Sequence, residues 1–113
     1  MHNFRELNVW KKAMVIVEKT YETSKELPES EKFTFISQIT RCALSIPSNI
    51  AEGAGRNTDK DFGRFLNISV GSSYEIETQL ILIEKIFKID SKELILLVTE
   101  VQRMLFSLIK SKK

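Results

Sequence analysis

Four basic residues of this chain could contact phosphate groups: Arg41, Arg56, Lys60 and Arg64. The last three lie close together, just after the sequence Gly-Ala-Gly at positions 53–55. Guanidinium and ammonium groups donate charge-assisted hydrogen bonds to phosphate oxygens, and on nucleic acid they displace counterions. We therefore take these four residues as the first candidates for phosphate contacts with RNA.

The overall charge gives this prediction little support. Seventeen basic and fifteen acidic residues leave a formal charge of +2, which is too balanced to indicate nucleic-acid binding without a favourable arrangement. Asp59 and Asp61 also dilute the positive charge of the stretch, and the Gly-Ala-Gly sequence lacks the lysine and spacing of a phosphate-binding P-loop. Lysines near the end of a helix interact favourably with the negative end of the helix dipole and are typical of frayed, soluble termini. We interpret the lysines at the C-terminus in this way.

A polar line on one helical face has two possible meanings. Arg41, Ser45, Asn49 and Glu52 are separated by four, four and three residues, so they share one side of a helix. Such a line commonly sets the register of packed helices, and we favour that interpretation over a binding site. Arg41 would then pair with Glu75 or Glu77 instead of phosphate.

The residue types required for common catalytic and metal sites are scarce. His2 is the only histidine, so a histidine-based triad and a ferritin-like metal site are both excluded. Cys42 is the only cysteine, and its place in an apolar helical pattern indicates a buried residue, not an activated thiol. We expect no enzyme activity, no metal and no cofactor.

Four helical segments should position these residues. The spacing predicts helices over about 5–26, 29–54, 58–87 and 90–110, of which the third is about thirty residues long. Thr58 is the expected N-cap of the third segment. Short connections between long helices indicate an all-α protein, an antiparallel up-down-up-down four-helix bundle formed by residues 1–113 as a single domain.

Apolar residues three and four apart predict the inner faces. The first segment offers Leu7, Trp10, Met14, Val17 and Tyr21. From all four segments we predict a continuous core that includes Trp10, Met14, Ile39, Ile46, Phe65, Ile76, Leu80 and Val101. The fourth segment carries more apolar residues than one bundle would cover, which suggests that a partner subunit covers the remainder.

The proline and glycines have expected structural roles. Pro47 removes a hydrogen bond inside the second helix and predicts a bend there. Gly53 and Gly55 are expected to end that helix in the left-handed conformation. Gly71 is expected to allow a close approach of the second and third helices, opposite Ala43.

No long apolar run is present, and the start MHNFRELNVWKK lacks the apolar core of a signal peptide. We therefore expect a cytoplasmic protein with no membrane partner.

Four ordered motifs carry a family resemblance. They are FRELNVW at 4–10, LPESE at 27–31, QITRCALSIPSNIAEGAGR at 38–56 and GSSYEIETQL at 71–80. Together they resemble the four-helix-bundle family encoded by intervening sequences of bacterial 23S ribosomal RNA genes. The family is similar to the pentameric accessory protein of diversity-generating retroelements, which works with a reverse transcriptase and RNA. The resemblance implies a homo-oligomer, most simply a pentamer, that acts as a noncatalytic RNA-associated scaffold. A ring that binds only a partner protein is the alternative, and salt-sensitive RNA binding would separate the two.

Overall fold

The computed structural model describes residues 2–112, which form four long α-helices with short connections. A 3-10 turn at Phe4–Glu6 precedes α1 at Asn8–Ser24. A second 3-10 turn at Glu29–Glu31 and a π-helical turn at Lys32–Ile36 lead into α2 at Ser37–Ala54. The remaining helices are α3 at Asp59–Phe87 and α4 at Lys92–Lys110. The predicted all-α class and the four helices are thereby confirmed.

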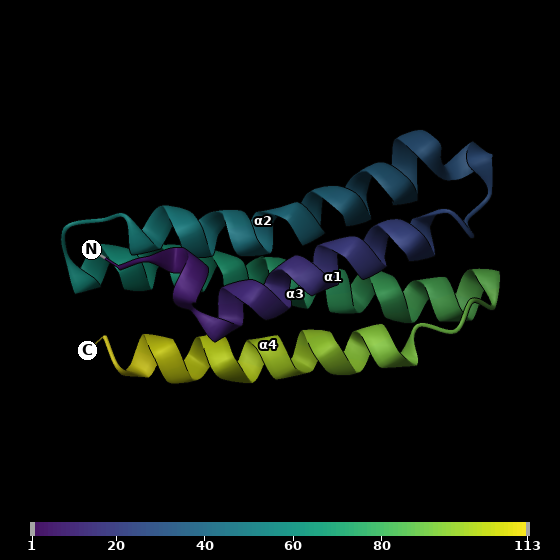
Figure 1. The fold of residues 1–113 in the computed structure, drawn as a ribbon. Coiled ribbons are helices and arrows are strands. Elements are labelled where there is room, and N and C mark those ends of the chain that lie inside the picture. The colour runs from purple at the N-terminus through teal and green to yellow at the C-terminus, as the bar shows by residue number, and fades with distance from the viewer. Residues whose placement is uncertain (1, 113) are drawn as a thin grey trace.

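The helices run up, down, up and down along a body of 43 × 23 × 20 Å (Figure 1). Each helix packs against the next one in sequence, and α1 packs against α4, which closes the bundle. Consequently α1 and α3 occupy diagonal positions, as do α2 and α4. The N-terminus, the α2–α3 turn and the C-terminus all lie at one end of the bundle (Figure 1).

Local sequence signals account for the helix ends. Thr58 is extended, and its hydroxyl accepts a hydrogen bond of 3.1 Å from the backbone N–H of Asp61, so the predicted N-cap of α3 is confirmed. At the other end of α3, Lys88 adopts the left-handed conformation with φ 59°. The chain then reaches α4 through Ser91, whose N–H bonds to the Glu84 carboxylate at 2.9 Å.

The core is a continuous apolar cluster with contributions from all four helices. Of the predicted core residues, those of α2, α4 and the centre of α3 are confirmed as buried: Ile39, Ile46, Ile76, Leu80 and Val101. Trp10 is partly buried and packs on this cluster. Phe65 is only partly buried, and the guanidinium groups of Arg56 and Arg64 lie over its ring.

The predicted inner face of α1 was wrong at Met14 and Tyr21, whereas Leu7, Trp10 and Val17 of the same predicted stripe are partly buried and pack against the core. Met14 and Tyr21 are 41% and 46% exposed, whereas the buried positions of α1 are Val9, Ala13, Ile16, Thr20 and Ser24. The buried stripe lies about 100° around the helix from the predicted one. α1 carries two neighbouring apolar stripes, and the one that contains the small residues Ala13 and Ser24 faces the core.

Gly55 is the C-cap of α2, as predicted, whereas the predicted left-handed conformation and the predicted close contact at Gly71 were wrong. Gly55 ends α2 with a right-handed φ of −84°, and no glycine among residues 2–112 has a positive φ. Gly71 is exposed and has open space where a Cβ would be. The close approach of α2 and α3 lies instead at Gly53, where an added Cβ would be 2.7 Å from the Cβ of Phe65 and 2.9 Å from Cδ1 of Phe62.

Serine hydrogen bonds join α2 and α3 two turns before Gly53. The Ser69 hydroxyl donates to the Ile46 carbonyl at 2.9 Å, and the Ser72 hydroxyl donates to the Ser45 hydroxyl at 2.8 Å. Asn49 donates to the Ser45 carbonyl one turn away. The Pro47 ring is buried, and α2 continues through it as one helix. The polar line on α2 thus takes part in the packing against α3 at Ser45, and Asn49 is bonded to Ser45 within α2.

Candidate nucleic-acid interface

Arg56 and Arg64 converge on one aromatic ring beside the α2–α3 turn. The guanidinium carbon of Arg56 lies 4.7 Å from the centroid of the Phe65 ring, and that of Arg64 lies 4.5 Å from the same centroid. Arg56 follows the end of α2, whereas Arg64 stands on the second turn of α3. The structure therefore places together two of the four predicted phosphate-contact residues.

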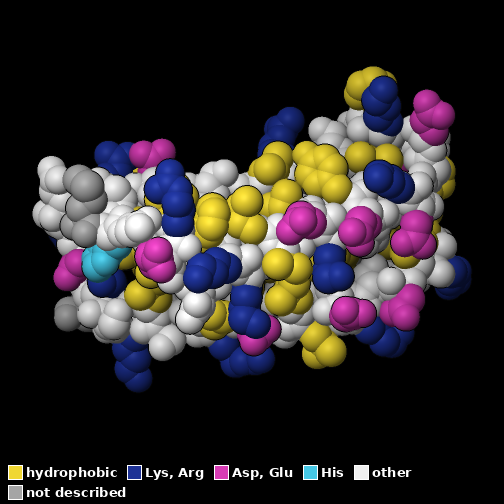
Figure 2. All heavy atoms as spheres, viewed as in Figure 1, with side chains coloured by type: hydrophobic (Ala, Val, Ile, Leu, Met, Phe, Trp, Pro, Cys, Tyr) yellow, Lys and Arg dark blue, Asp and Glu magenta, His cyan; other side chains and the backbone are white. Residues whose placement is uncertain are grey.

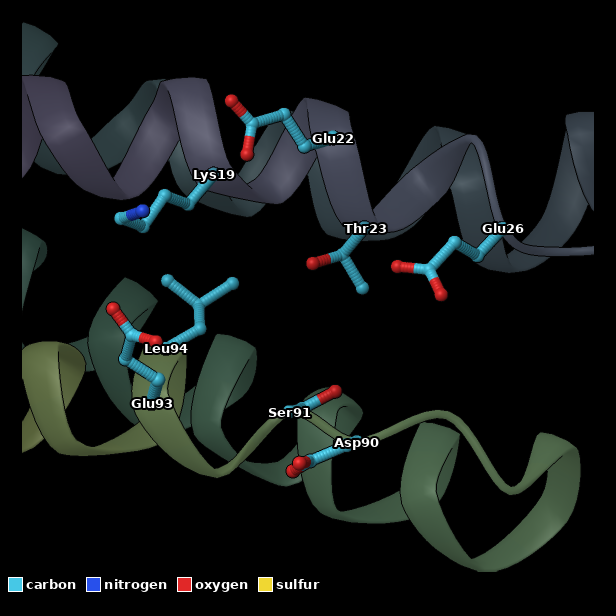
Figure 3. A pocket seen from close by; sticks show the side chains of 8 residues that line it. All are labelled: Lys19, Glu22, Thr23, Glu26, Asp90, Ser91, Glu93 and Leu94. Carbon is cyan, nitrogen blue, oxygen red and sulfur yellow. The ribbon is translucent and has the colours of Figure 1, made fainter.

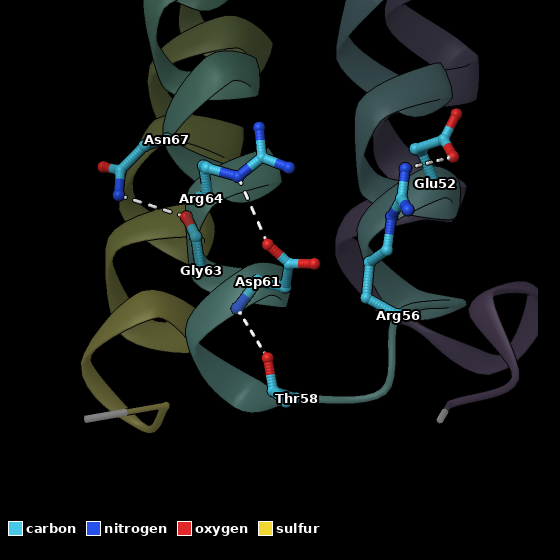
Figure 4. A network of polar contacts seen from close by, with 7 residues as sticks. All are labelled: Glu52, Arg56, Thr58, Asp61, Gly63, Arg64 and Asn67. Carbon is cyan, nitrogen blue, oxygen red and sulfur yellow. Dashed lines mark hydrogen bonds and ion pairs between the residues drawn. The ribbon is translucent and has the colours of Figure 1, made fainter.

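Each of these arginines also binds a carboxylate, as Figure 4 shows. The Arg56 Nη2 donates to Glu52 Oε2 at 2.9 Å, and the Arg64 Nε donates to Asp61 Oδ1 at 3.3 Å. Both ion pairs are substantially exposed to solvent. Exposed pairs of this kind contribute only about 0–1 kcal/mol, so an incoming phosphate can compete for the guanidinium groups.

Lys60 lies on the first turn of α3, beside an open hollow of about 820 Å³ between the start of α3 and the end of α4. The hollow is lined by Thr58, Asp59, Lys60, Asp61, Gly63, Arg64, Asn67, Ile109 and Lys112. Lys60 and Arg64 therefore border the same depression. Three of the four predicted residues belong to this end of the bundle.

Arg41 stands apart from the other three. It is exposed on α2, fifteen residues before Arg56, which corresponds to about 22 Å along a helix. No ion pair to Arg41 occurs within residues 2–112, and Glu77, one of its two expected partners, accepts a hydrogen bond from Gln102 at 2.8 Å. If Arg41 contacts RNA, it must do so through a surface that extends along α2.

Lys112 joins the interface, although the sequence indicated only a frayed helix end. Its Nζ lies 3.9 Å from Asp59 Oδ1, 3.4 Å from His2 Nε2 and 5.3 Å from the centroid of the Phe62 ring. The backbone N–H of His2 in turn donates to the Ala54 carbonyl at 2.8 Å. The run of lysines near the C-terminus was the available signal, but only the fold shows that it reaches the α2–α3 turn.

Positive charge is concentrated at this end of the bundle. We define the basic end as the described residues before Ala13, those from Glu52 to Arg64, and those from Glu100 onward. It carries nine Lys and Arg residues and five Asp and Glu residues. The rest of the described chain carries seven Lys and Arg residues and ten Asp and Glu residues. The basic residues are Arg5, Lys11, Lys12, Arg56, Lys60, Arg64, Arg103, Lys110 and Lys112. A nearly neutral chain therefore has a net positive end and a net negative remainder.

The opposite end is acidic. Figure 2 shows Asp and Glu side chains gathered over that half of the visible face. A hollow of about 200 Å³ opens there between the end of α1 and the start of α4 (Figure 3). Glu22 of α1 and Glu26 of the following turn line one side of it, and Asp90 and Glu93 line the other. These carboxylates would repel phosphate, so a polyanion would meet less repulsion at the basic end.

Cys42 has no geometry for nucleophilic chemistry. Burial, the largest effect, raises the pKa of its thiol above the usual value, while a hydrogen bond from Gln79 Nε2 at 3.6 Å acts in the opposite direction. A thiol with a raised pKa is mostly protonated at neutral pH and reacts slowly. The buried, inert interpretation of Cys42 agrees with this environment.

Within residues 2–112, no group of three or more His, Cys, Asp or Glu side chains lies in a position to hold a metal ion. None of the helices in this part of the chain is long and apolar enough to cross a membrane.

The comparisons with known proteins agree on one family. A family model described as 23S rRNA-intervening sequence protein matches residues 5–107. A crystal structure of a protein with unknown function from the S23 ribosomal protein family of Bacteroides thetaiotaomicron VPI-5482 has a TM-score of 0.83 and 28% sequence identity to this chain. The match covers 90% of this chain and 98% of that one. The comparison with curated proteins gave no match.

Proposed function

Because the chain belongs to the 23S rRNA-intervening sequence protein family, we propose that it is a noncatalytic, homo-oligomeric scaffold that binds RNA through its basic end. The observation that carries this proposal is the unequal distribution of charge along the bundle. Nine basic and five acidic residues at one end form a local positive field that the formal charge of +2 conceals. Association with a phosphate backbone depends on such a local field.

The geometry at Phe65 suits RNA for a second reason. Arg56 and Arg64 are held on its ring, so their guanidinium groups lose less side-chain freedom when they bind phosphate or stack on an unpaired base. Thr58 caps α3 and keeps this turn in place. The basic end thus combines positional order with exposed cationic groups.

Several copies would multiply this charge. A single basic end supplies few phosphate contacts, but copies arranged side by side would present a repeated set on one surface, with additive effects on counterion release. The proposed number of copies, five, comes from the family resemblance. A cytoplasmic location and the absence of catalytic activity are parts of the same proposal.

Homo-oligomerisation is the first prediction of this proposal. Exposed apolar side chains on α1, α3 and α4 are expected to keep the copies associated at micromolar concentration. Sedimentation equilibrium should give a mass several times that of the 13.0 kDa chain, about 65 kDa if five copies associate. A mass of one chain under these conditions would contradict the scaffold.

The second prediction concerns the dependence of RNA binding on salt. Fluorescence anisotropy with structured 23S ribosomal RNA fragments should show binding that weakens steeply between low and physiological salt. Replacing Arg56 and Arg64 together with alanine should lower the slope of log K against log salt by about 1–2, since each lost phosphate contact removes about 0.7–0.9. The oligomer should remain intact.

Lys25→Ala/Lys32→Ala is the matched control, because it removes the same charge outside the basic end. It should change the slope much less. Arg41→Ala tests the fourth predicted residue: a lowered slope would extend the interface along α2. Absence of RNA binding at low salt by a correctly assembled oligomer would leave the protein-binding adaptor ring as the better explanation.

A further inference from the structure

A buried hydroxyl without a partner lies at the acidic end of the bundle. Ser91 is the N-cap residue of α4, a position where a serine side chain usually accepts a hydrogen bond from the first turn of the helix. Here the side chain makes no such bond, and Asp90 Oδ1 accepts the N–H of Lys92 at 3.0 Å. Ser91 is only 3% exposed, and its Oγ has no hydrogen-bond partner among residues 2–112. Because a buried polar group is unfavourable without a partner, this hydroxyl indicates one from outside the chain.

The Ser91 side chain is turned into the hollow between the end of α1 and the start of α4. Figure 3 shows it directed toward the α1 side, and the Glu26 carboxylate extends from the opposite wall. Both residues line the hollow, whose volume is about 200 Å³. Pockets for drug-sized ligands have roughly 300–1,000 Å³, so a short and slender ligand suits this hollow better than a nucleotide does.

The hollow is strongly negative. Four carboxylates line it, those of Glu22, Glu26, Asp90 and Glu93. No ion pair to Glu22, Glu26 or Glu93 occurs within residues 2–112, and Asp90 Oδ1 has an exposed one, 3.8 Å from Lys92 Nζ. Lys19 also lines the hollow, so the charged lining residues have a net charge of −3.

The helix dipoles do not reverse this sign. The hollow lies between the carboxyl end of α1, which is the negative end of that helix dipole, and the amino end of α4, which is the positive end of its own. The two partial charges offset each other, so the carboxylates decide the sign of the potential. This site therefore attracts a cation.

The spacing of the carboxylates favours an organic cation over a metal ion. Among the described residues, no group of three or more His, Cys, Asp or Glu side chains is placed to hold a metal. Mg²⁺ requires oxygen ligands at about 2.0–2.1 Å around a single point. A flexible chain with several ammonium groups needs no common centre, because each ammonium can donate hydrogen bonds to a different carboxylate.

We propose that this hollow binds a linear alkyl polyamine. One ammonium group donates a hydrogen bond to Ser91 Oγ, and the other ammonium groups contact the carboxylates on both walls. The methylene segments between them contact Leu94, whose side chain also lines the hollow (Figure 3). The hollow is at the opposite end of the bundle from the basic end, so this inference does not depend on the proposed RNA binding.

Ser91→Ala tests the site without changing any charge. Isothermal titration calorimetry of spermidine into the full chain at low salt should show saturable binding, and Ser91→Ala should weaken it about threefold to tenfold. The variant should keep the melting temperature of the unmodified chain, since the lost hydroxyl has no partner among residues 2–112. Absence of saturable binding to the unmodified chain, or an unchanged affinity in Ser91→Ala, would overturn the site.

Two charge variants should change the affinity for spermidine in opposite directions. Glu22→Gln/Glu26→Gln removes two carboxylates from the hollow and should weaken binding about threefold to tenfold. Lys19→Gln removes a competing ammonium and should strengthen binding about twofold to fivefold. The matched control, Glu29→Gln/Glu75→Gln, changes two exposed glutamates outside the hollow and should have little effect. Equal weakening by this control would show that spermidine follows only the overall charge, which would contradict a defined site.

Competing ligands identify the class of cation. Mg²⁺ at the same concentration as spermidine should displace little of it, and N-acetyl-lysine amide, which has a single ammonium group, should bind about tenfold more weakly. Efficient displacement by equimolar Mg²⁺ would assign the hollow to metal ions. A trilysine peptide that binds more tightly than spermidine would assign the hollow to the lysines of a partner protein. Either of these two results would overturn the polyamine as the ligand.

Discussion

Ile46→Asp is expected to unfold most of the protein at 25 °C. Ile46 is fully buried in the core, on the face of α2 that meets α3, and its carbonyl accepts the hydrogen bond from Ser69. An aspartate side chain at this position would be shielded from water. It would have to become protonated or remain as an unpaired buried charge, and either costs several kcal/mol. Domains of this size have a free energy of unfolding of only about 5–15 kcal/mol.

Two further variants make this test quantitative. Ile46→Ala should keep the fold and lower the free energy of unfolding by about 2–5 kcal/mol, through lost burial and a residual cavity. Ile68→Asp makes the same chemical change at an exposed isoleucine of α3 and should have a small effect. Urea denaturation at equal protein concentration measures all three, because self-association would otherwise shift the midpoint. Similar losses for Ile46→Asp and Ile68→Asp would show that the inner face is misassigned.

Alanine is expected to have opposite effects at Gly53 and Gly71. At Gly53 the added Cβ would approach Phe65 Cβ to 2.7 Å and the Phe62 carbonyl oxygen to 3.2 Å, so α2 and α3 would have to separate. Such overpacking typically costs about 1–3 kcal/mol, which exceeds the gain in helix propensity of about 0.5–1 kcal/mol. Gly53→Ala should therefore lower the free energy of unfolding.

Gly71→Ala should instead raise it by about 0.5–1 kcal/mol. Gly71 is exposed inside α3, has a negative φ, and has nothing within 4 Å of the added Cβ. Only the helix propensity and the reduced freedom of the unfolded chain then change. Thermal and urea unfolding of the two variants measure the difference directly. Stabilisation by both substitutions would mean that α2 and α3 are not in close contact at Gly53.

Several features of the fold followed from local sequence because they depend on local interactions. Four segments with apolar residues three and four apart were sufficient to predict four helices, and Thr58 was sufficient to predict the start of α3. The inner face of α2 was also predictable, since Ile39, Ile46 and Ile50 form its single continuous apolar stripe. Helix periodicity and capping act over a few residues, so the sequence contains them directly.

Tertiary packing decided what these local signals left open. α1 carries two apolar stripes about 100° apart, and periodicity alone allows either of them to face the core. In the structure the stripe with Ala13 and Ile16 is buried against α2 and α4. The same packing chose Gly53 over Gly71 as the close contact, because only Gly53 stands against α3.

The candidate interface divides in the same way. The sequence by itself determined which cationic residues exist and placed Arg56, Lys60 and Arg64 in one stretch of the chain. Only the tertiary structure decided that Arg56 and Arg64 share the Phe65 ring, that Lys112 joins them, and that Arg41 stands apart. The physical reason is that an electrostatic field depends on distances in space, and antiparallel helices bring the first, middle and last residues of this chain to one end of the bundle.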